Sequence, residues 1–483
     1  MTEKQTDNTL PDLQNRFKFY KISLLTALLL LFATHFTHAQ TWSEPAVIYT
    51  ANKFSGFPDF TIDNNGNIHC VWTTKHGTNY YRIYYSKSID DGDSWTTPIN
   101  ASMNDTKWMD LPHIVSDQDN TLHLTYDYDV GSIYNTYIIH RIFNGVSWVF
   151  ADTVTKGYPG ATKNRLVIDN NDKLYCFWFT GYYTGYQTLD PGATTWSEIS
   201  WPYGFSMKLF THKPIVGSDN VIHFLGKSHI TANKSIVSYY RMYQGDWSPI
   251  EKFSDLIRSF GSDMALDNQD LPHIVWQQFN DYYSPGEDSI MYSYNNGYFW
   301  SEPELIVQDA NKMSIAVDPN NDIHLLLNVK EDSVYRHKHY IKSAGNWELP
   351  QTIEENDYFY LPQKTIYRDG KLYHLYSKTD TVINSMSAYT SILMRKLEII
   401  TTNTDHNKSS IDNLVIAPNP FRFYTKIEFE IHKKEKLEIQ VYNIHGIPVN
   451  TLLNEVTKPG RIELTWDGTD SYGNKVPKGF YII

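Results

Sequence analysis

The sequence predicts an all-β protein in which a seven-bladed β-propeller is followed by a small second β domain. Tryptophan recurs at roughly 50-residue intervals through most of the chain, and this is the period of a radial repeat. An alternating strand that follows an Asn/Asp/Gly turn recurs in step with it, also seven times. The tryptophans are Trp42, Trp95, Trp148, Trp196, Trp247, Trp300 and Trp347; the second marker centres on His69, His123, Tyr175, His223, His273, His324 and Tyr373.

Each repeat unit is expected to contain four strands, because its hydrophobic pattern alternates with period two and is interrupted by turns. A short apolar strand such as 111–115 turns tightly into a second strand such as 122–126. A tyrosine-rich third strand such as 80–86 leads through a glycine turn to the outer strand, which begins at the repeat tryptophan. Four-stranded units repeated around an axis form a β-propeller, and the alternation excludes helical repeats.

The spacing also predicts how the ring closes. After Trp347 the next repeat tryptophan is due near position 397, where the chain has Leu397 and then leaves the pattern. The missing outer strand is present at the other end, at 42–48. We therefore expect the N-terminal strand to complete the seventh blade, because this pairing removes the exposed edge that an open array would leave.

Charge and the N-terminal residues indicate where the protein acts. The net charge of −12 over 483 residues excludes a nucleic-acid backbone as partner. Lys18 and Lys21 precede an apolar run at 22–32, and small residues lead up to Ala39. This pattern predicts a signal peptide at 1–39, with an uncleaved membrane anchor as the alternative, although the run is short for a bilayer span.

The two cysteines are expected to be buried free thiols. Cys70 and Cys176 occupy the same place in the first and third units, so a whole blade separates them, whereas a disulfide needs Cα atoms within about 7 Å. The repeated histidines are interpreted as core or inter-blade contacts, so no metal site and no cofactor are expected. The Asn/Asp/Gly turns are best explained as hairpin turns, with structural calcium as the alternative.

One turn carries a recognisable motif. Ser88, Asp90, Gly92 and Trp95 match the Asp-box pattern, in which the acid accepts backbone N–H groups of the turn and the glycine takes positive φ. On this motif the region 40–400 resembles the sialidase-like (BNR/Asp-box) seven-bladed β-propellers. The resemblance implies that the box is structural and lies on the face away from the ligand site.

A ligand site is expected on the opposite face, near the axis, where the loops between blades and between second and third strands meet. The candidates for catalysis there are histidines, tyrosines and arginines, and the candidates for ligand binding are mainly aromatic. The catalytic candidates are His76, His212, His229, Tyr158, Tyr182, Arg165 and Arg258; the ligand-binding candidates are Trp108, Asp110, Tyr203, Tyr282, Tyr283 and Tyr358.

Three functions compete for this site, and the sequence leaves open whether the protein is an enzyme. The main prediction is an extracellular propeller, secreted or attached to the surface, that binds or processes a glycan as a monomer. The first alternative is a polysaccharide lyase with a His or Tyr base and an Arg that neutralises a uronate. A sialidase is less favoured, because the Arg-Ile-Pro element is absent and only Arg165 and Arg258 lie on suitable loops.

The C-terminal region forms a separate unit. Residues 401–412 are polar and predict a linker, and alternating strands follow within 413–483. The motifs Pro-Asn-Pro-Phe at 418–421, Val-Tyr-Asn-Ile-His-Gly at 441–446 and Trp-Asp-Gly at 466–468 resemble the Ig-like type IX secretion sorting domain of Bacteroidota. The resemblance implies an Ig-like β-sandwich and the type IX secretion machinery as partner. Such domains continue into a further strand with a basic end, whereas this sequence ends at Ile483. This predicts either a truncated sequence or a domain that has lost its last strand.

Overall fold

The computed structural model divides the chain into two units, 1–400 and 401–483. The described residues are 41–482 without 51–52, 77–79, 105, 132–134, 157, 182, 203–208, 232–233, 253–258, 280–287, 298, 357–359, 385–386, 400–410, 419–420, 432–434, 444–447 and 480. The predicted signal peptide and most of the predicted linker lie outside them. The same residues contain no helix with the length and hydropathy to span a bilayer.

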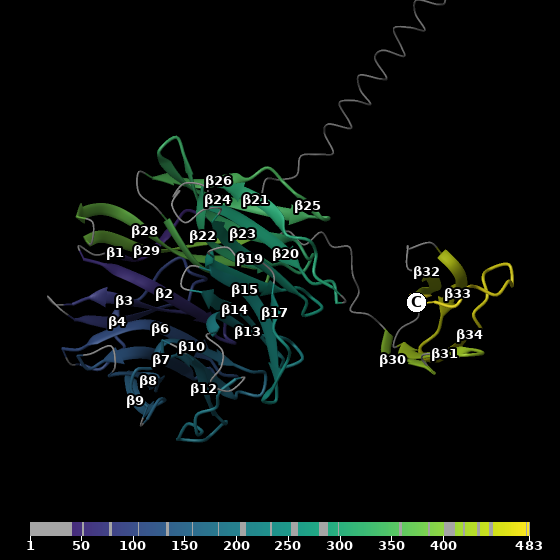
Figure 1. Cartoon of the computed structure of the whole chain (residues 1–483), viewed down its shortest axis with the longest axis horizontal. Helices are drawn as coiled ribbons and strands as arrows, with labels where there is room; N and C mark the ends of the chain where they lie inside the picture. Colours follow the sequence, from purple (N-terminus) through teal and green to yellow (C-terminus); the bar gives the residue numbers. More distant parts are fainter. Residues whose placement is uncertain are drawn as a thin grey trace, which may run out of the picture. The chain divides into compact units, whose positions relative to one another are not determined.

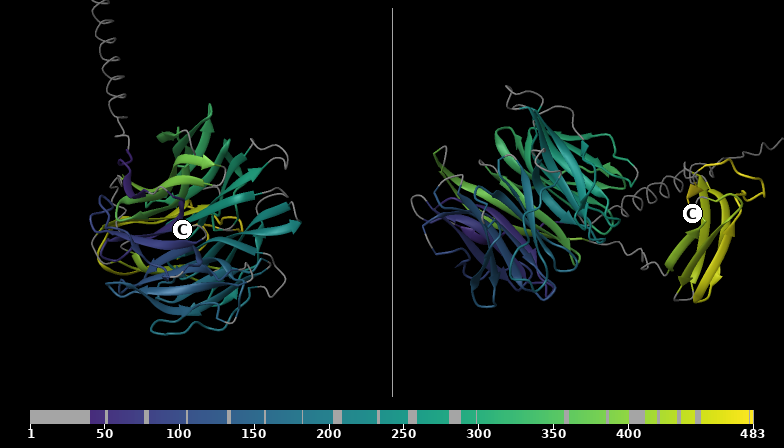
Figure 2. Two further views of the ribbon diagram at one scale, coloured as in Figure 1. Left: turned by 90° about the vertical axis from the view of Figure 1, so that its left-hand side faces the viewer. Right: turned by 60° about the horizontal axis from the view of Figure 1, so that its bottom comes forward.

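The described residues of the first unit form seven antiparallel sheets arranged around a centre, as the repeat predicts (Figures 1 and 2). The first strands of the blades are β2 (Ser55–Ile62), β6 (Trp108–Ser116), β10 (Thr162–Ile168), β13 (Leu209–Val216), β18 (Ser259–Leu266), β22 (Ala310–Val317) and β27 (Tyr360–Arg368). The second strands are β3 (Ile68–Lys75), β7 (Leu122–Asp129), β11 (Leu174–Phe179), β14 (Ile222–Thr231), β19 (Pro272–Phe279), β23 (Ile323–Glu331) and β28 (Lys371–Asn384).

The outer half of each blade is less regular than the inner half. The third strands are β4 (Tyr81–Ser88), β8 (Thr136–Phe143), β12 (Thr184–Leu189), β15 (Lys234–Tyr243), β20 (Asp288–Tyr294), β24 (Val334–Ser343) and β29 (Ser387–Glu398). The outermost strands are β1 (Ala46–Thr50), β5 (Ile99–Asn100), β9 (Trp148–Thr153), β16 (Asp246–Trp247), β17 (Glu251–Lys252), β21 (Glu304–Gln308), β25 (Asn346–Trp347) and β26 (Gln351–Asn356).

The N-terminal strand completes blade seven, which confirms the predicted closure. The sheet order of this blade is β1-β29-β28-β27, and β1 pairs antiparallel with β29 from Ala46 opposite Met394. Just before β1, the Ser43 N–H donates to the Lys396 carbonyl at 2.8 Å, and Arg395 Nη1 donates to the Ser43 carbonyl at 2.6 Å. Trp42 is buried here, and its Nε1 donates to Nδ1 of His339 in blade six.

The repeat tryptophans join neighbouring blades. Trp148 of blade two meets Tyr85 of blade one edge-on, with ring centroids 5.4 Å apart, and Trp42 meets His339 in the same way at 5.3 Å. Four further pairs repeat this T-shaped contact with the third strand of the preceding blade. They are Trp196 with His140, Trp247 with Tyr186, Trp300 with Tyr239 and Trp347 with Tyr292. Each blade therefore needs its neighbour to complete its core, in which T-shaped aromatic pairs are favourable.

The repeat histidines are part of the same contacts. Nδ1 of His69 lies 2.8 Å from the Tyr85 hydroxyl, and Nε2 lies 3.1 Å from Asp63 in the preceding turn. His273 repeats the contact with Tyr292 at 2.7 Å. Both ring nitrogens of His69 are therefore hydrogen-bonded, whereas Nε2 of His273 lies 3.6 Å from Asp267. The two histidines are buried structural contacts, as the repeat predicts.

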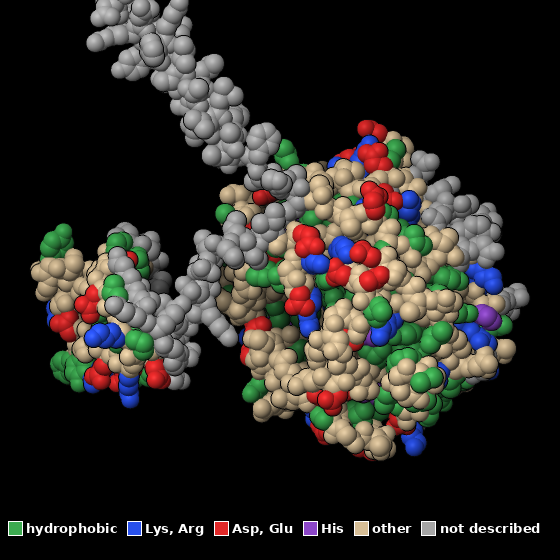
Figure 3. All heavy atoms as spheres, turned by 180° about the vertical axis from the view of Figure 1, so that it is seen from behind, with side chains coloured by type: hydrophobic (Ala, Val, Ile, Leu, Met, Phe, Trp, Pro, Cys, Tyr) green, Lys and Arg blue, Asp and Glu red, His purple; other side chains and the backbone are tan. Residues whose placement is uncertain are grey.

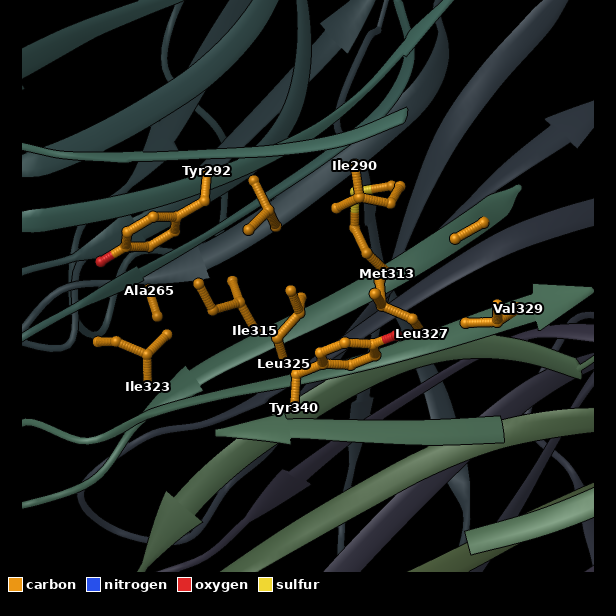
Figure 4. Packing of buried hydrophobic residues seen from close by; sticks show 12 residues of the cluster. Ala265, Ile290, Tyr292, Met313, Ile315, Ile323, Leu325, Leu327, Val329 and Tyr340 are labelled. Atoms are coloured by element: carbon orange, nitrogen blue, oxygen red, sulfur yellow. The ribbon is translucent and has the colours of Figure 1, made fainter. Parts of the chain in front are cut away.

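Aliphatic and aromatic side chains fill the remaining space between blades. Between blades five and six, Ile290 and Tyr292 of β20 pack with Leu325 and Leu327 of β23 (Figure 4). Cys70 and Cys176 are buried in two different clusters and are free thiols, as predicted.

The Asp-box turn also contributes to ring closure. Ser94 N–H donates to Asp90 at 2.9 Å, Trp95 Nε1 donates to the Gly92 carbonyl at 3.1 Å, and Gly92 has a φ of 86°. The neighbouring Asp91 reaches blade seven, where it forms ion pairs with Lys371 at 2.5 Å and Lys396 at 3.1 Å. The turn therefore connects the first blade to the last.

The second unit is a small two-sheet β domain. One sheet has the order β30-β31-β34 and the other β33-β32-β35. Ile427, Phe429, Val441 and Trp466 are buried in its core. The strands are β30 (Ile411–Ala417), β31 (Thr425–Ile431), β32 (Glu435–Asn443), β33 (Pro448–Thr457), β34 (Gly460–Trp466) and β35 (Tyr481–Ile482).

Candidate functional site

A cavity of about 760 Å³ lies along the centre of the propeller. The first strands of all seven blades line it, so every blade contributes side chains to one space. This volume is in the range of small-molecule and sugar sites. On the outer surface, acidic and basic side chains lie mixed among polar ones on the face drawn in Figure 3. The cavity is therefore the candidate functional site of the propeller.

One position of the first strand is polar in every blade, and these seven residues are called here the channel ring. In each blade this polar position lies two residues before the residue that pairs with the repeat His or Tyr. The strands are otherwise mainly apolar. The ring consists of Asp59, His113, Arg165, Lys213, Asp263, Ser314 and Lys364.

A backbone irregularity lies just before the channel ring in each first strand. The pairing register shifts there, as in a β-bulge. Phe57, Leu111, Lys163 and Lys312, at the same position of four blades, adopt positive φ between 50° and 56°. Non-glycine residues pay about 1–3 kcal/mol for such a conformation, and such strain concentrates at functional sites.

Three ring residues on neighbouring blades form a continuous polar array. Asp59 Oδ2 lies 3.3 Å from Nδ1 of His113, and Nε2 of His113 lies 3.0 Å from Arg165 Nη1. Lys364 pairs with the other Asp59 oxygen at 2.8 Å. Because Asp59 accepts a hydrogen bond from Nδ1–H of a neutral imidazole, the Nε2 lone pair of His113 faces the guanidinium.

The array keeps His113 in its basic form. Burial and the nearby Arg165 lower the pKa of His113, against the opposing effect of Asp59. The pKa of Asp59 is lowered too, because Lys364 and His113 together outweigh the effect of burial. Near neutral pH the site therefore holds a neutral imidazole between a carboxylate and a guanidinium.

The opposite side of the ring repeats half of this arrangement. Lys213 pairs with Asp263 at 2.8 Å, just as Lys364 pairs with Asp59. Asp263 also accepts the Ile315 N–H at 3.0 Å, and Asp59 accepts the equivalent Ile114 N–H at 3.1 Å. In place of His113, however, this side has Ser314. The lysine–aspartate pair is therefore structural in both places, and the histidine is specific to blade two.

A buried carboxylate positions Arg165. Asp127 of β7 accepts the Lys163 N–H at 2.7 Å and the side-chain amide of Asn164 at 2.7 Å. The same amide donates to the Leu111 carbonyl at 2.8 Å, and Arg165 Nη1 donates to the Asn164 carbonyl at 2.8 Å. Asp127 thus holds the bulge of β10 from which the arginine projects. Burial raises the pKa of Asp127 to about 6.

The raised pKa of Asp127 predicts a pH-dependent effect of Asp127→Asn on stability. A carboxyl group with a folded pKa above its unfolded value stabilises fully below the unfolded pKa, and this contribution is lost as pH rises through the folded pKa. Between pH of about 4 and 6 the asparagine variant should gain up to about 3 kcal/mol relative to the wild type. Urea unfolding at several pH values measures the difference, and Asp246→Asn on the exposed surface is the control. A difference that does not change with pH would contradict the prediction.

Two ligand-binding candidates lie together at the start of β6, just before the residues of that strand that line the cavity. Trp108 is 44% exposed at the start of β6, and its ring centroid lies 4.1 Å from that of Tyr81. Asp110 accepts a hydrogen bond from Thr73 of blade one at 2.9 Å, and burial raises its pKa. These residues were expected on loops but lie in strands, because the first strands extend further than the apolar pattern indicates.

The other catalytic candidates are not assembled with Arg165 in the described part of the chain. Tyr158 packs its ring against Trp178 and Trp201, 5.4 and 5.5 Å away, within an apolar cluster. His76 is exposed and lies 3.1 Å from the Tyr84 hydroxyl. The backbones of His212 and His229 lie in β13 and β14, and their side chains are outside the description. Tyr182, Tyr203, Arg258, Tyr282, Tyr283 and Tyr358 lie outside the described residues.

Sequence reasoning missed His113, the central residue of the array. The strand at 111–115 was expected to be an apolar inner strand, and a single histidine in it gave no signal alone. Alignment of the seven first strands would have shown it, because one column reads Asp, His, Arg, Lys, Asp, Ser, Lys.

Comparisons with known proteins identify the fold. Residues 424–483 match the model of the FlgD Ig-like domain, and no curated protein has a significantly similar sequence. A solved ulvan lyase, described as a new family of polysaccharide lyase, is 14% identical over 72% of this chain and 95% of its own, with a TM-score of 0.55. Its complex with -[GlcA(1-4)Rha3S]- gives the same values. An intramolecular trans-sialidase from Ruminococcus gnavus is 12% identical over 74% of this chain and 97% of its own, with a TM-score of 0.44. The likeness to the lyase confirms the predicted propeller.

Proposed function

We propose that the propeller binds an acidic polysaccharide at its central cavity and cleaves it by β-elimination next to a uronate carboxyl group. The observation that carries this proposal is the 3.0 Å distance between Nε2 of His113 and Nη1 of Arg165. Elimination needs a base at the carbon beside the carboxyl group and a cation at the carboxyl group itself. Those two positions are adjacent in a uronate, so the base and the cation must also be adjacent.

In the proposed mechanism each residue of the array has a role. Arg165 pairs with the substrate carboxylate and leaves Nε2 of His113 free to accept the proton from the neighbouring carbon. The electron pair of that C–H bond forms a carbon–carbon double bond as the glycosidic C–O bond breaks. The departing oxygen takes up the proton from the imidazolium, which restores His113. Asp59 holds the imidazole orientation, and Asp127 with Asn164 holds the arginine.

Two further observations favour a lyase over the alternatives. The solved ulvan lyase shares this fold, so the same scaffold houses elimination chemistry in another protein. A sialidase needs three arginines at the substrate carboxylate, whereas among the described residues Arg165 is the one arginine that lines the cavity. A pure binding module has no need of a neutral histidine held between a carboxylate and a guanidinium.

We infer that this chemistry takes place outside the cell. The signal-peptide pattern at 1–39 and the resemblance of 413–483 to a type IX sorting domain support export. The match of 424–483 to an Ig-like domain agrees with the architecture of such a domain. Fractionation of the host culture tests this location, and retention in the periplasm would count against it.

The proposed reaction is tested by incubating the protein with a panel of uronate polymers. Ulvan, alginate, hyaluronan and polygalacturonate vary the uronic acid and its neighbours. Elimination creates an unsaturated uronate whose ultraviolet absorbance increases with time, and mass spectrometry confirms the double bond. Release of saturated reducing ends instead would indicate hydrolysis, and binding to a panel member without any new end would indicate a binding module; both results overturn the proposal.

A further inference from the structure

We propose that four aromatic rings form a subsite that holds the same polysaccharide chain as it leaves the cavity across blades one and two. The rings belong to Phe57, Phe54, Tyr81 and Trp108, and are called here the aromatic strip. This inference rests on the proposed function, and it adds a place where sugars beyond the cleaved linkage bind.

The rings of the strip follow one another without a gap. The centroid of Phe57 lies 6.2 Å from that of Phe54, which lies 5.9 Å from Tyr81, which lies 4.1 Å from Trp108. All four residues lie at or just before the first residues of strands that begin on one face of the propeller. The four rings therefore form one continuous aromatic cluster, in which Phe54 and Tyr81 meet edge-on.

The strip is continuous with the cavity. Phe57 lines the cavity together with Asp59 and His113, and it is also 43% exposed. Its positive φ of 50° turns the strand at the bulge, a conformation that is unfavourable for a phenylalanine. At the far end Trp108 is 44% exposed. A chain bound at His113 therefore meets aromatic surface as it passes out over blade one.

The backbone beneath the strip is shaped for Phe54. Gly56 lies under its ring, and a Cβ atom at this position would stand 2.9 Å from Phe54 Cζ. A side chain here would therefore displace the ring. The φ of Gly56 is not in the left-handed region, so its backbone conformation does not require glycine. The close approach of the Phe54 ring does, because it leaves no room for a side chain.

The charges around the strip suit an anionic chain. Lys53 is exposed beside Phe54 in the sequence, and Arg82 follows Tyr81. Both are close enough to His76 that, together with burial, they lower the pKa of its imidazole. Sugar rings offer C–H faces to aromatic side chains, and cations at the edges attract carboxylate or sulfate groups on the chain. An apolar protein segment would not use these cations, so the observations favour an acidic glycan.

The strip is tested with oligosaccharides of two lengths on the uncleaving His113→Ala background. Short and long oligosaccharides prepared by partial acid hydrolysis of ulvan are titrated by calorimetry. Trp108→Ala should weaken binding of the long oligosaccharides about tenfold and leave the short ones unchanged, because only a long chain reaches the far ring. Gly56→Ala should also weaken binding of the long oligosaccharides, although it removes no aromatic group, because the added Cβ displaces the Phe54 ring. Phe299→Ala, which removes a 66% exposed ring from a turn of blade five, is the matched control.

The outcomes separate this inference from the proposed function. One outcome is that long chains bind through the strip but the protein that keeps His113 forms no unsaturated product. This result would support the strip and overturn the lyase. Formation of unsaturated product with equal KM for wild type and Trp108→Ala would overturn the strip and leave the lyase standing. Equal loss of short and long binding in Trp108→Ala would also overturn the strip, and melting curves of each variant exclude misfolding as its cause.

Discussion

Replacing Arg165 with alanine is expected to lower kcat for the proposed elimination about 100- to 1,000-fold, since the variant loses the cation assigned to the developing charge on the uronate. Arg165→Lys should recover part of the rate, because lysine keeps the charge but loses the fork that pairs with two carboxylate oxygens. The measurement is the initial rate of unsaturated product formation at saturating polysaccharide, with melting temperature as a check on folding.

The same experiment includes the base. His113→Ala should lower kcat about 100- to 10,000-fold, and the double variant should lose little more than the worse single variant, because the two groups act on one step. Ser314→Ala, at the same position of blade six, is the matched control and should retain wild-type rates. Since the pKa of His113 is lowered, the acid limb of kcat/KM should lie below the usual histidine value of about 6.5. Full activity in His113→Ala would refute the assignment.

Deleting residues 41–50 is expected to destabilise the entire propeller and not one blade. The deletion removes β1 from blade seven and takes Trp42 out of a buried site between blades six and seven. Loss of a buried tryptophan alone costs about 3–5 kcal/mol. The exposed edge of β29 would then be free to pair with other chains. Unfolding in guanidinium, followed by both tryptophan fluorescence and far-ultraviolet circular dichroism, measures the effect.

A peptide with the sequence of 41–50 provides the control for this deletion. Added in trans, it should restore stability in proportion to the logarithm of its concentration, because it binds the folded ring alone. A peptide in which alanine replaces Trp42 should restore less. Trp148→Ala in the intact chain removes the same repeat contact without opening the ring. Its free energy of unfolding should therefore fall only by the amount expected for one buried tryptophan. A deletion variant as stable as the wild type would contradict the role of β1 in closure.

The sequence predicted the ring better than it predicted the site. The spacing of the tryptophans is a property of each blade, and six of the seven tryptophans meet a ring on the third strand of the preceding blade edge-on, so copies of one contact recur along the chain. The same regularity predicts that Trp42 belongs to blade seven. Repeated local contacts leave a periodic signal, and a periodic signal survives substitutions in single blades.

The site consists of residues that differ between equivalent positions of the blades, so the repeat pattern does not predict it. Arg165 was expected on a loop, but it lies in β10, because the bulge and Asp127 extend the strand beyond its apolar core. His113 was absent from the candidates, because its partners Asp59 and Arg165 are about fifty residues away on either side. Such contacts arise only when neighbouring blades are placed next to each other.

The position of β1 beside β29 determines where the chain of this domain can be joined or broken. The first and last strands of the propeller lie next to each other, and just before β1 the Ser43 N–H donates to the Lys396 carbonyl at 2.8 Å. A domain whose ends meet in this way can be inserted into a loop of a host protein, or have its ends joined and a new break made elsewhere. A break between two blades would keep every sheet within one continuous stretch of chain, and the ring would then depend on side-chain packing alone. With its break inside blade seven, the chain closes its circle through backbone hydrogen bonds.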